Sequence, residues 1–193
     1  MILDDFAAAL GSEMFSDVTS GTAKLSSVLI IIYGNPPKFI MTKKASNLKI
    51  HAGEIAFPGG KQDDGDADML CTALRETREE LNLDISRSDV IGQLETVRTL
   101  NSNFIITPFV SIMRSLPTIT CNQEVDSVLY IPAIPFLKTL RNDPDPEHNR
   151  IQEMYTFTFK GHLVWGASAR MLKQIFDRLH ARGLLYSDVR ESL

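Results

Sequence analysis

Residues 59–83 read GGKQDDGDADMLCTALRETREELNL and place a glycine turn before a segment of helical character. We expect a helix over residues 67–81. Because side chains at i, i+3 and i+4 share one side of a helix, Glu76, Glu79 and Glu80 should project together toward solvent. Carboxylates this close repel one another, and a divalent cation supplies a reason to keep them together. The stretch therefore predicts a helix that presents acids to a metal ion.

The ends of this helix are marked by residues with known capping preferences. Asp66 is the expected N-cap, and Asp68 suits the positive end of the helix dipole. Asn82 tolerates the left-handed conformation of the residue that follows a helix. The side chains expected to face the core are Leu70, Leu74, Thr77 and Leu81.

The strands are indicated by apolar runs. Residues 28–33 (VLIIIY) are continuously apolar, which predicts a strand buried on both faces, and residues 38–42 return as the second strand of a hairpin. Further strands are expected at 53–57, 90–94, 104–113, 125–131, 155–159 and 162–165. We expect helices over 3–10 and from Ser168 to Ala181, with Gly183 as the stop, and a surface loop over 142–146. These elements predict an α/β fold with helices packed on a mixed sheet.

Length and composition narrow the class of protein. The 193 residues suit a single domain, in which residues 1–25 form an N-terminal helical extension and loop. The net charge of −4 and the lack of a basic block argue against nucleic acid as a partner. The run 28–33 is too short to span a membrane and the N-terminus lacks a signal-peptide pattern. We expect a cytoplasmic monomer or homodimer in which Cys71 and Cys121 are free thiols.

The clustered glutamates suggest phosphate chemistry. Oxygen ligands favour Mg²⁺ or Mn²⁺, which would neutralise a pyrophosphate and make a bound water easier to deprotonate. One carboxylate could then act as general base, while Arg75, four residues before Glu79, could brace the cluster. A turn without side chains at Gly59 and Gly60 allows the backbone to approach a metal or phosphate. The alternative interpretation is an ordinary solvated acidic helix face.

Residues 75–83, RETREELNL, together with the glycine turn resemble the signature box of the Nudix hydrolases. These enzymes use a divalent metal to cleave a nucleoside diphosphate linked to another group. The resemblance implies a Nudix-like α/β/α sandwich with a mixed central β-sheet. It also implies metal ligands at Glu79, Glu80 and the carbonyl of Gly60 or its neighbour, a further ligand or base at Glu76, and a brace at Arg75.

Three positions depart from the box. Asn82 replaces a glycine, and Thr77 replaces an aliphatic residue. The glutamate expected in the middle of the box falls at Ala67. If its role exists here, the residue that takes it is Asp64, Asp66 or Asp68.

A second resemblance concerns the substrate. Residues 41–61, MTKKASNLKIHAGEIAFPGGK, resemble the extended motif of the coenzyme A pyrophosphatase branch, with lysines at 43 and 44 where arginine is common. Residues 162–170, HLVWGASAR, are similar to the C-terminal segment of that branch. The residues available for the phosphates of coenzyme A are Lys43, Lys44, Lys49, Lys61 and Gly59, with ordinary surface lysines as the alternative interpretation.

Residues outside the helix complete the set of candidates. Glu124 precedes a strand and is a candidate extra ligand or base, since the superfamily often recruits such an acid. We expect Glu54 to support the glycine turn or the metal cluster, and His51 to have a turn or core role. Trp165 is expected in the core.

The leading hypothesis is a metal-dependent hydrolase that splits coenzyme A or acyl-coenzyme A into phosphopantetheine and adenosine 3′,5′-bisphosphate. Another Nudix substrate, such as ADP-ribose, a nucleotide sugar or a dinucleoside polyphosphate, is the alternative within enzymes. A non-catalytic nucleotide-binding module on the same fold is the alternative from a different class. The complete set of acids at residues 76, 79 and 80 favours an enzyme.

Overall fold

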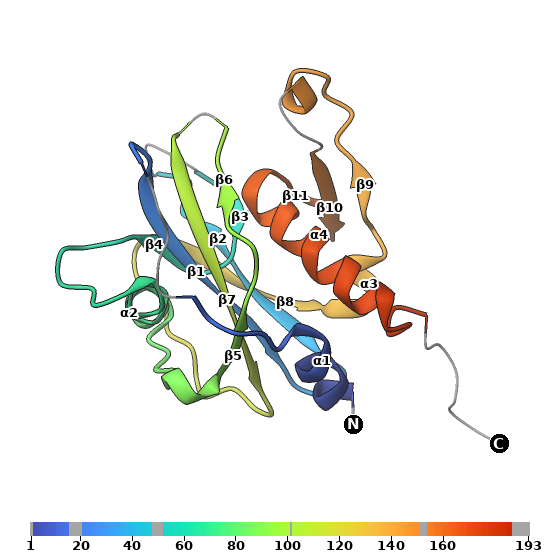
Figure 1. Ribbon diagram of the computed structural model, residues 1–193, viewed down its shortest axis with the longest axis horizontal. Helices are drawn as coiled ribbons and strands as arrows, with labels where there is room; N and C mark the ends of the chain where they lie inside the picture. The colour runs from blue at the N-terminus through green and yellow to red at the C-terminus, as the bar shows by residue number, and fades with distance from the viewer. Residues whose placement is uncertain (1, 16–20, 48–51, 101, 151–153, 187–193) are drawn as a thin grey trace.

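Strand β1 (Lys24–Tyr33) lies at the centre of a mixed sheet with the order β3-β2-β1-β7-β5. The computed structural model describes residues 2–15, 21–47, 52–100, 102–150 and 154–186. β1 runs parallel to β7 (Phe104–Met113) along its whole length and forms an antiparallel hairpin with β2 (Lys38–Lys44). The predicted hairpin and mixed sheet are therefore confirmed (Figure 1).

The other strands extend this sheet or form a smaller one. β4 (Gly59–Lys61) pairs with β1, β6 (Val97–Arg98) with β7, and β8 (Val125–Pro132) with β2. β3 (Ile55–Ala56) and β5 (Val90–Gln93) lie at the two ends of the sheet order. The smaller sheet has the order β11-β10-β9, and its strands are β9 (Arg141–Asn142), β10 (Tyr155–Phe159) and β11 (His162–Val164).

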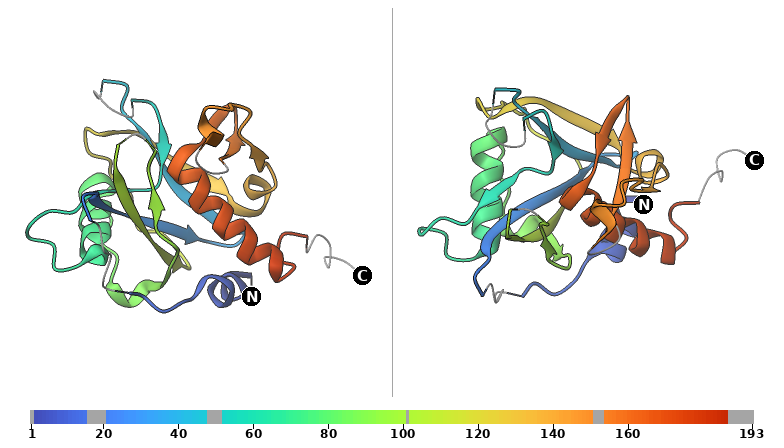
Figure 2. Two further views of the ribbon diagram at one scale, coloured as in Figure 1. Left: turned by 45° about the horizontal axis from the view of Figure 1, so that its top comes forward. Right: turned by 90° about the horizontal axis from the view of Figure 1, so that it is seen from above.

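Helices cover both faces of the central sheet, which confirms the predicted α/β/α sandwich (Figures 1 and 2). Helix α2 (Met69–Leu81) lies on one face. The other face is covered by α4 (Gly166–Ala181), with α1 (Ile2–Leu10) and the short α3 (Ala133–Leu137) beside it. Two 3₁₀ turns, Arg87–Asp89 and His148–Arg150, lie in the connections of the described chain.

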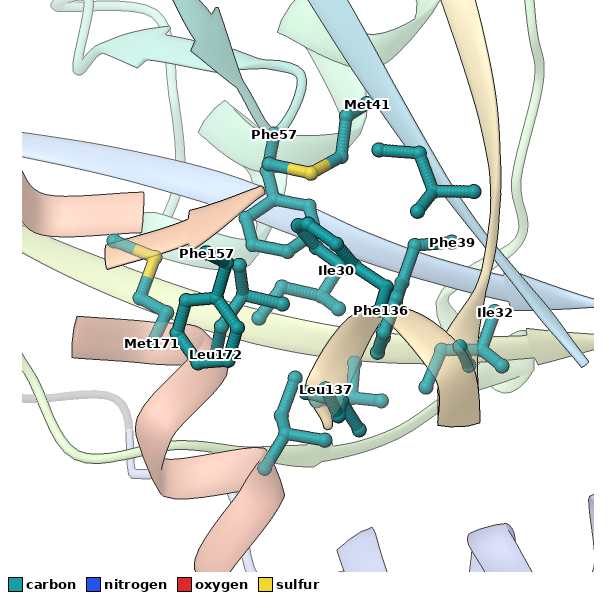
Figure 3. Packing of buried hydrophobic residues seen from close by; sticks show 14 of the residues in the cluster. Ile30, Ile32, Phe39, Met41, Phe57, Phe136, Leu137, Phe157, Met171 and Leu172 are labelled. Carbon is teal, nitrogen blue, oxygen red and sulfur yellow. The ribbon is translucent and has the colours of Figure 1, made fainter. Parts of the chain in front are cut away.

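Strand β1 contributes to two separate hydrophobic cores, because successive side chains of a strand point to opposite faces. Ile30 and Ile32 belong to the larger core, together with Phe136 and Leu172 (Figure 3). Leu29 and Ile31 belong to the smaller core beneath α2. All four β1 side chains are fully buried, so the prediction of a strand buried on both faces is confirmed.

The ends of the two long helices differ from the prediction. Helix α2 begins at Met69, and Asp68 is the N-cap that accepts a hydrogen bond from the Cys71 amide (2.7 Å), so the prediction of Asp66 as N-cap is wrong. Asn82 has the expected left-handed conformation, with φ of 49°. Helix α4 begins at Gly166, two residues before the expected start at Ser168, with Trp165 as its N-cap.

The prediction that Trp165 packs in the core is also wrong. Its side chain is 43% exposed, and its ring stacks on His148 at a centroid distance of 5.7 Å. The strand expected over 53–57 is reduced to Ile55–Ala56, while Asn142 of the expected loop belongs to β9. The structure also contains β4, β6 and α3, which the sequence pattern did not predict.

Candidate functional site

Helix α2 carries the three predicted acids, and its position follows from its apolar side. Leu70, Ala73 and Leu81 are buried in the core that also contains Leu29 and Ile31 of β1. The flank that carries Glu76 then faces β4, where the carboxyl group lies against Gly60. The buried apolar side of α2 thus sets the direction in which Glu76 points.

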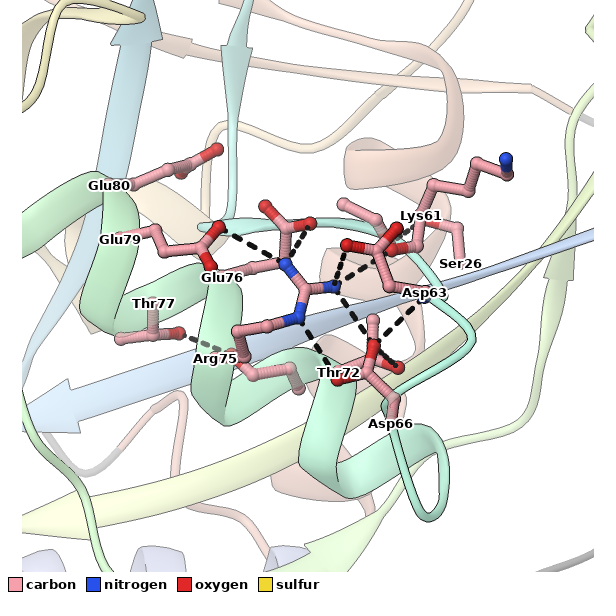
Figure 4. Close-up of polar contacts among 12 residues, drawn as sticks. Ser26, Lys61, Asp63, Asp66, Thr72, Arg75, Glu76, Thr77, Glu79 and Glu80 are labelled. Atoms are coloured by element: carbon pink, nitrogen blue, oxygen red, sulfur yellow. Dashed lines mark hydrogen bonds and ion pairs between the residues drawn. The ribbon is translucent and has the colours of Figure 1, made fainter.

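Arg75 connects the acids of α2 to the segment before the helix, and its guanidinium uses all five of its N–H donors. Nε and Nη2 donate to Oδ1 and Oδ2 of Asp66, at 3.0 and 2.9 Å. Nη1 donates to Glu76 Oε1 (2.9 Å) and Glu79 Oε2 (3.1 Å), and Nη2 also donates to the carbonyl of Lys61 (3.0 Å) (Figure 4). The geometry is that of a brace, because these charge-assisted bonds fix the guanidinium in every direction.

Three aspartates were candidates for the role of the missing glutamate, and Asp66 is the one that lies beside Arg75. Its side chain is only 4% exposed and also accepts hydrogen bonds from Thr72 Oγ1 (2.9 Å) and the Asp63 amide (3.0 Å). The hydrogen bonds from Arg75 lower the pKa of Asp66 to about 2. This carboxylate is therefore ionised at neutral pH and belongs to the brace.

The other two aspartates have different surroundings. Asp68 caps α2 and forms an ion pair with Arg87 (2.6 Å), which lowers the pKa of Asp68. Asp64 is exposed. The position counted along the box falls at Ala67, one residue beyond Asp66. Asp66 lies in a turn in which its amide donates to the Asp63 carbonyl (3.0 Å).

The glycine turn is shaped by close contacts. A Cβ atom at Gly60 would lie 2.6 Å from Glu76 Oε2, so a side chain here would displace the Glu76 carboxylate from its hydrogen bond with Arg75. The Gly60 carbonyl accepts a hydrogen bond from Ser26 Oγ (2.6 Å), a contact that no sequence pattern predicts. Gly59 has φ of 154°, and a Cβ atom there would lie 2.6 Å from Val28 Cα, so this glycine permits the pairing of β4 with β1.

Glu76 is partly buried, and Glu80 is almost completely buried. Burial raises the pKa of Glu76, and the hydrogen bond from Arg75 opposes that rise. Glu80 is 1% exposed, which corrects the expectation that all three acids face solvent. Burial also raises the pKa of Glu80, and the ammonium of Lys44 opposes it by forming an ion pair with Glu80 Oε1. Glu79 is exposed.

The remaining predicted residues are distributed around these acids. Lys43 Nζ lies 3.6 Å from Asp126 Oδ2 at the surface. Lys61 is exposed, and its ammonium extends away from Arg75 (Figure 4). Glu124 is exposed close to the end of α2, where its charge adds to the raised pKa of Glu80. Lys49 and His51 lie outside the described residues.

The chemistry of the candidate ligands fits a hard divalent cation. The side chains of Glu76, Glu79 and Glu80 and the carbonyl of Gly60 offer oxygen atoms, the ligands that Mg²⁺ and Mn²⁺ prefer. Within the described part of the chain, the buried Glu80 Oε2 has no hydrogen-bond partner, although buried polar atoms are normally paired. The described residues contain no group of three or more acidic, histidine or cysteine side chains arranged as a metal centre. Arg75 and Lys44 hold these carboxylates in their present directions.

Two further expectations can be compared with the structure. Cys71 and Cys121 are free, as predicted. Among the residues that the structure describes, no helix is both long and apolar enough to cross a membrane.

The chain matches known proteins in sequence and in fold. The NUDIX domain family matches residues 23–127. The chain is 34% identical over 154 residues to the uncharacterized Nudix hydrolase NudL of Cronobacter sakazakii, covering 78% of this chain and 80% of that protein. It is 31% identical over 164 residues to the uncharacterized Nudix hydrolase NudL of Yersinia pestis, covering 83% and 82% of the two chains.

Solved structures share the fold. The MutT/nudix family protein of Enterococcus faecalis aligns with a TM-score of 0.60 at 12% identity, covering 88% of this chain and 66% of that one. The MutT protein of Methanosarcina mazei Go1 aligns with a TM-score of 0.57 at 16% identity, covering 81% and 94%. Together with the sequence matches, the fold and the acid-bearing helix show that this chain belongs to the Nudix family of hydrolases.

Proposed function

We propose that this Nudix hydrolase is a divalent-metal-dependent pyrophosphohydrolase of coenzyme A or acyl-coenzyme A. The observation that carries the proposal is the braced acid cluster, in which Arg75 holds Glu76 and Glu79 beside the buried Glu80 and the glycine turn. Water would add to one phosphorus of the pyrophosphate, and the bridging P–O bond would break. The products would be phosphopantetheine, which keeps its acyl group when acyl-coenzyme A is cleaved, and adenosine 3′,5′-bisphosphate.

The metal ion, Mg²⁺ or Mn²⁺, would be held by Glu79, Glu80 and the carbonyl of Gly60, with Glu76 as a further ligand or as the base. When bound, it supplies charge neutralisation for the pyrophosphate and a lower pKa for a coordinated water. Arg75 keeps Glu76 and Glu79 oriented through its hydrogen bonds of 2.9 and 3.1 Å. The proton of the attacking water would pass to Glu76, whose pKa is raised by burial, or to Glu124.

The choice of coenzyme A is supported by the two sequence segments that resemble the coenzyme A branch and by nearby cationic side chains. Coenzyme A carries a 3′-phosphate in addition to the pyrophosphate, so its recognition requires positive charge outside the metal site. Lys43 and Lys44 lie at the end of β2, and Lys61 lies at the end of β4. Lys49 and Gly59 complete the proposed substrate contacts.

A substrate panel with metal titration tests the proposal. Coenzyme A, acetyl-coenzyme A, ADP-ribose, a nucleotide sugar and a dinucleoside polyphosphate would be incubated with Mg²⁺ or Mn²⁺. The nucleotides released from each compound, which include adenosine 3′,5′-bisphosphate for the coenzyme A compounds, would be measured by chromatography. We expect release from the coenzyme A compounds only when metal is present. Rapid turnover of ADP-ribose without turnover of coenzyme A would contradict the substrate assignment and leave the reaction class standing.

The metal site is tested by Glu80→Gln, which keeps the shape of the side chain and removes its charge. We expect turnover to fall by at least about 100-fold while the fold is retained, because the site loses a charged ligand. Asp84→Asn is a matched control, since the Asp84 side chain is 86% exposed and contacts only Arg78 at 3.5 Å among the ion pairs of the described residues. Unchanged turnover in Glu80→Gln would refute the role of Glu80.

A further inference from the structure

Lys44 is the cation closest to the most deeply buried acid of the site. Its ammonium forms an ion pair with Glu80 Oε1, and the Lys44 side chain is only 15% exposed. Among the described residues, this is the one ion pair that Lys44 makes. The adjacent lysine behaves differently, because Lys43 reaches the surface carboxylate of Asp126, which is 53% exposed.

The backbones on both sides of the ion pair are fixed by one loop. The Asn122 amide donates to the Glu80 carbonyl (3.0 Å), and the Ala45 amide donates to the Glu124 carbonyl (2.9 Å). The Lys44 amide itself donates to the Glu54 carbonyl (2.9 Å). The end of β2 is thus tied to the end of α2, while the ammonium lies on a flexible chain of methylene groups that can move without the backbone.

The ion pair satisfies only half of the Glu80 carboxylate. Oε2 is buried and has no hydrogen-bond partner in the described part of the chain. A buried ion pair offsets the cost of its desolvation only when hydrogen bonds also satisfy the remaining lone pairs, so this pair is a poor source of stability. The charges of Glu76 and Glu124 also act on Glu80. Arg75 pairs with Glu76, whereas Lys44 pairs with Glu80 and leaves one oxygen of that carboxylate able to bind another cation.

We propose that Lys44 is a displaceable counter-ion, which neutralises Glu80 in the metal-free protein and yields that carboxylate to the divalent cation. The proposal rests on the metal site of the proposed function. A divalent cation at Glu80 repels a neighbouring ammonium, so metal and Lys44 compete for one carboxylate. The released ammonium remains at the edge of the acid cluster, where it is free to bind a phosphate oxygen of the substrate. Metal binding would thereby prepare the positive charge that the substrate needs.

Mn²⁺ binding to the full-length protein tests the competition, with free Mn²⁺ followed by electron paramagnetic resonance at pH 8. We expect Lys44→Met to bind Mn²⁺ at least about fivefold more tightly than the wild type, the effect of one neighbouring unit charge under strong solvent screening. Lys43→Met is the matched control and should leave the Mn²⁺ affinity unchanged. A folded Lys44→Met variant with unchanged or weaker Mn²⁺ affinity would overturn the proposal.

A measurement on the wild type avoids any loss of folding in the variant. Acetylation of lysines by an N-hydroxysuccinimide ester, followed by mass spectrometry, would compare the reactivity of Lys44 with and without saturating Mg²⁺. We expect metal to increase the labelling of Lys44 several-fold relative to Lys43, because the ion pair is broken; labelling that stays constant or decreases would refute the displacement. If the wild type binds no Mn²⁺ at all, the proposed metal site fails as well, and that result is distinct from binding that ignores Lys44.

Discussion

Replacing Asp66 by Asn removes one negative charge from the brace and changes little else. The side chain keeps its size, and one oxygen can still accept a hydrogen bond. The two hydrogen bonds with Arg75, at 3.0 and 2.9 Å, lose their ionic character, and one of the two acceptor oxygens becomes a donor that faces the guanidinium. Asp66→Asn therefore measures what the charge of this residue contributes to the folded state.

The magnitude follows from the pKa of Asp66. The hydrogen bonds from Arg75 lower this pKa from 3.8 to about 2. At about 1.4 kcal/mol per pKa unit, the folded protein favours the ionised carboxylate by about 2.5 kcal/mol. Hydrogen bonds to charged groups contribute about 1.5 to 3 kcal/mol, which agrees with this value. We expect Asp66→Asn to lower the free energy of unfolding by about 2.5 kcal/mol at pH 7.

Urea unfolding followed by circular dichroism measures this loss. Asp63→Asn is the matched control, because the Asp63 carboxylate is 67% exposed and lies 3.8 Å from Arg75 Nη2. Since the folded-state pKa of Asp66 is lowered, the stabilisation is fully present above pH 3.8 and is lost as the pH falls toward about 2. The difference between wild type and Asp66→Asn should shrink over that interval. Equal stability of Asp66→Asn and Asp63→Asn at pH 7 would refute the reasoning.

Other residues give shorter tests. Gly60→Ala places a Cβ atom 2.6 Å from Glu76 Oε2, so turnover should fall by about 100-fold, whereas Gly65→Ala, which meets no atom within 4 Å, should retain it. Asn82→Ala should cost about 1 kcal/mol in urea unfolding because φ is 49°, while Asn82→Gly should cost less; equal losses would argue against backbone strain as the cause. Trp165→Ala should change the free energy of unfolding by less than about 1 kcal/mol, because the side chain is 43% exposed. A loss typical of a buried aromatic residue would contradict that expectation.

The parts of the fold that the sequence predicts are those with a strong local pattern. The continuous apolar run in β1 and the apolar stripe of α2 are visible without any knowledge of their partners. β4 and β6 are only a few residues long and are defined by their pairing with β1 and β7, which local sequence does not encode. Trp165 was expected in the core because the end of a strand followed by Gly166 suits a buried junction, whereas its ring stacks on His148 and is 43% exposed.

The candidate site also combines features that the local sequence predicts with features that depend on tertiary contacts. The spacing of the three glutamates within one helix predicts that they lie together, and Arg75 is close enough in sequence to reach Glu79. The burial of Glu80 depends on Lys44, which is 36 residues away in sequence, and on the loop that contains Asn122. Contacts of this kind are set by the arrangement of strands and loops, so the sequence pattern had no means of distinguishing Glu80 from its neighbours.

The division of the interior by β1 has a consequence for how this chain can change. The face with Leu29 and Ile31 supports the acid-bearing helix, whereas the face with Ile30 and Ile32 supports α4 and the C-terminal layer (Figure 2). Because the two cores consist of different side chains, a substitution that repacks one core leaves the side chains of the other core in place. Substitutions in the larger core can therefore change the packing of α4 while the core beneath α2 keeps its side chains.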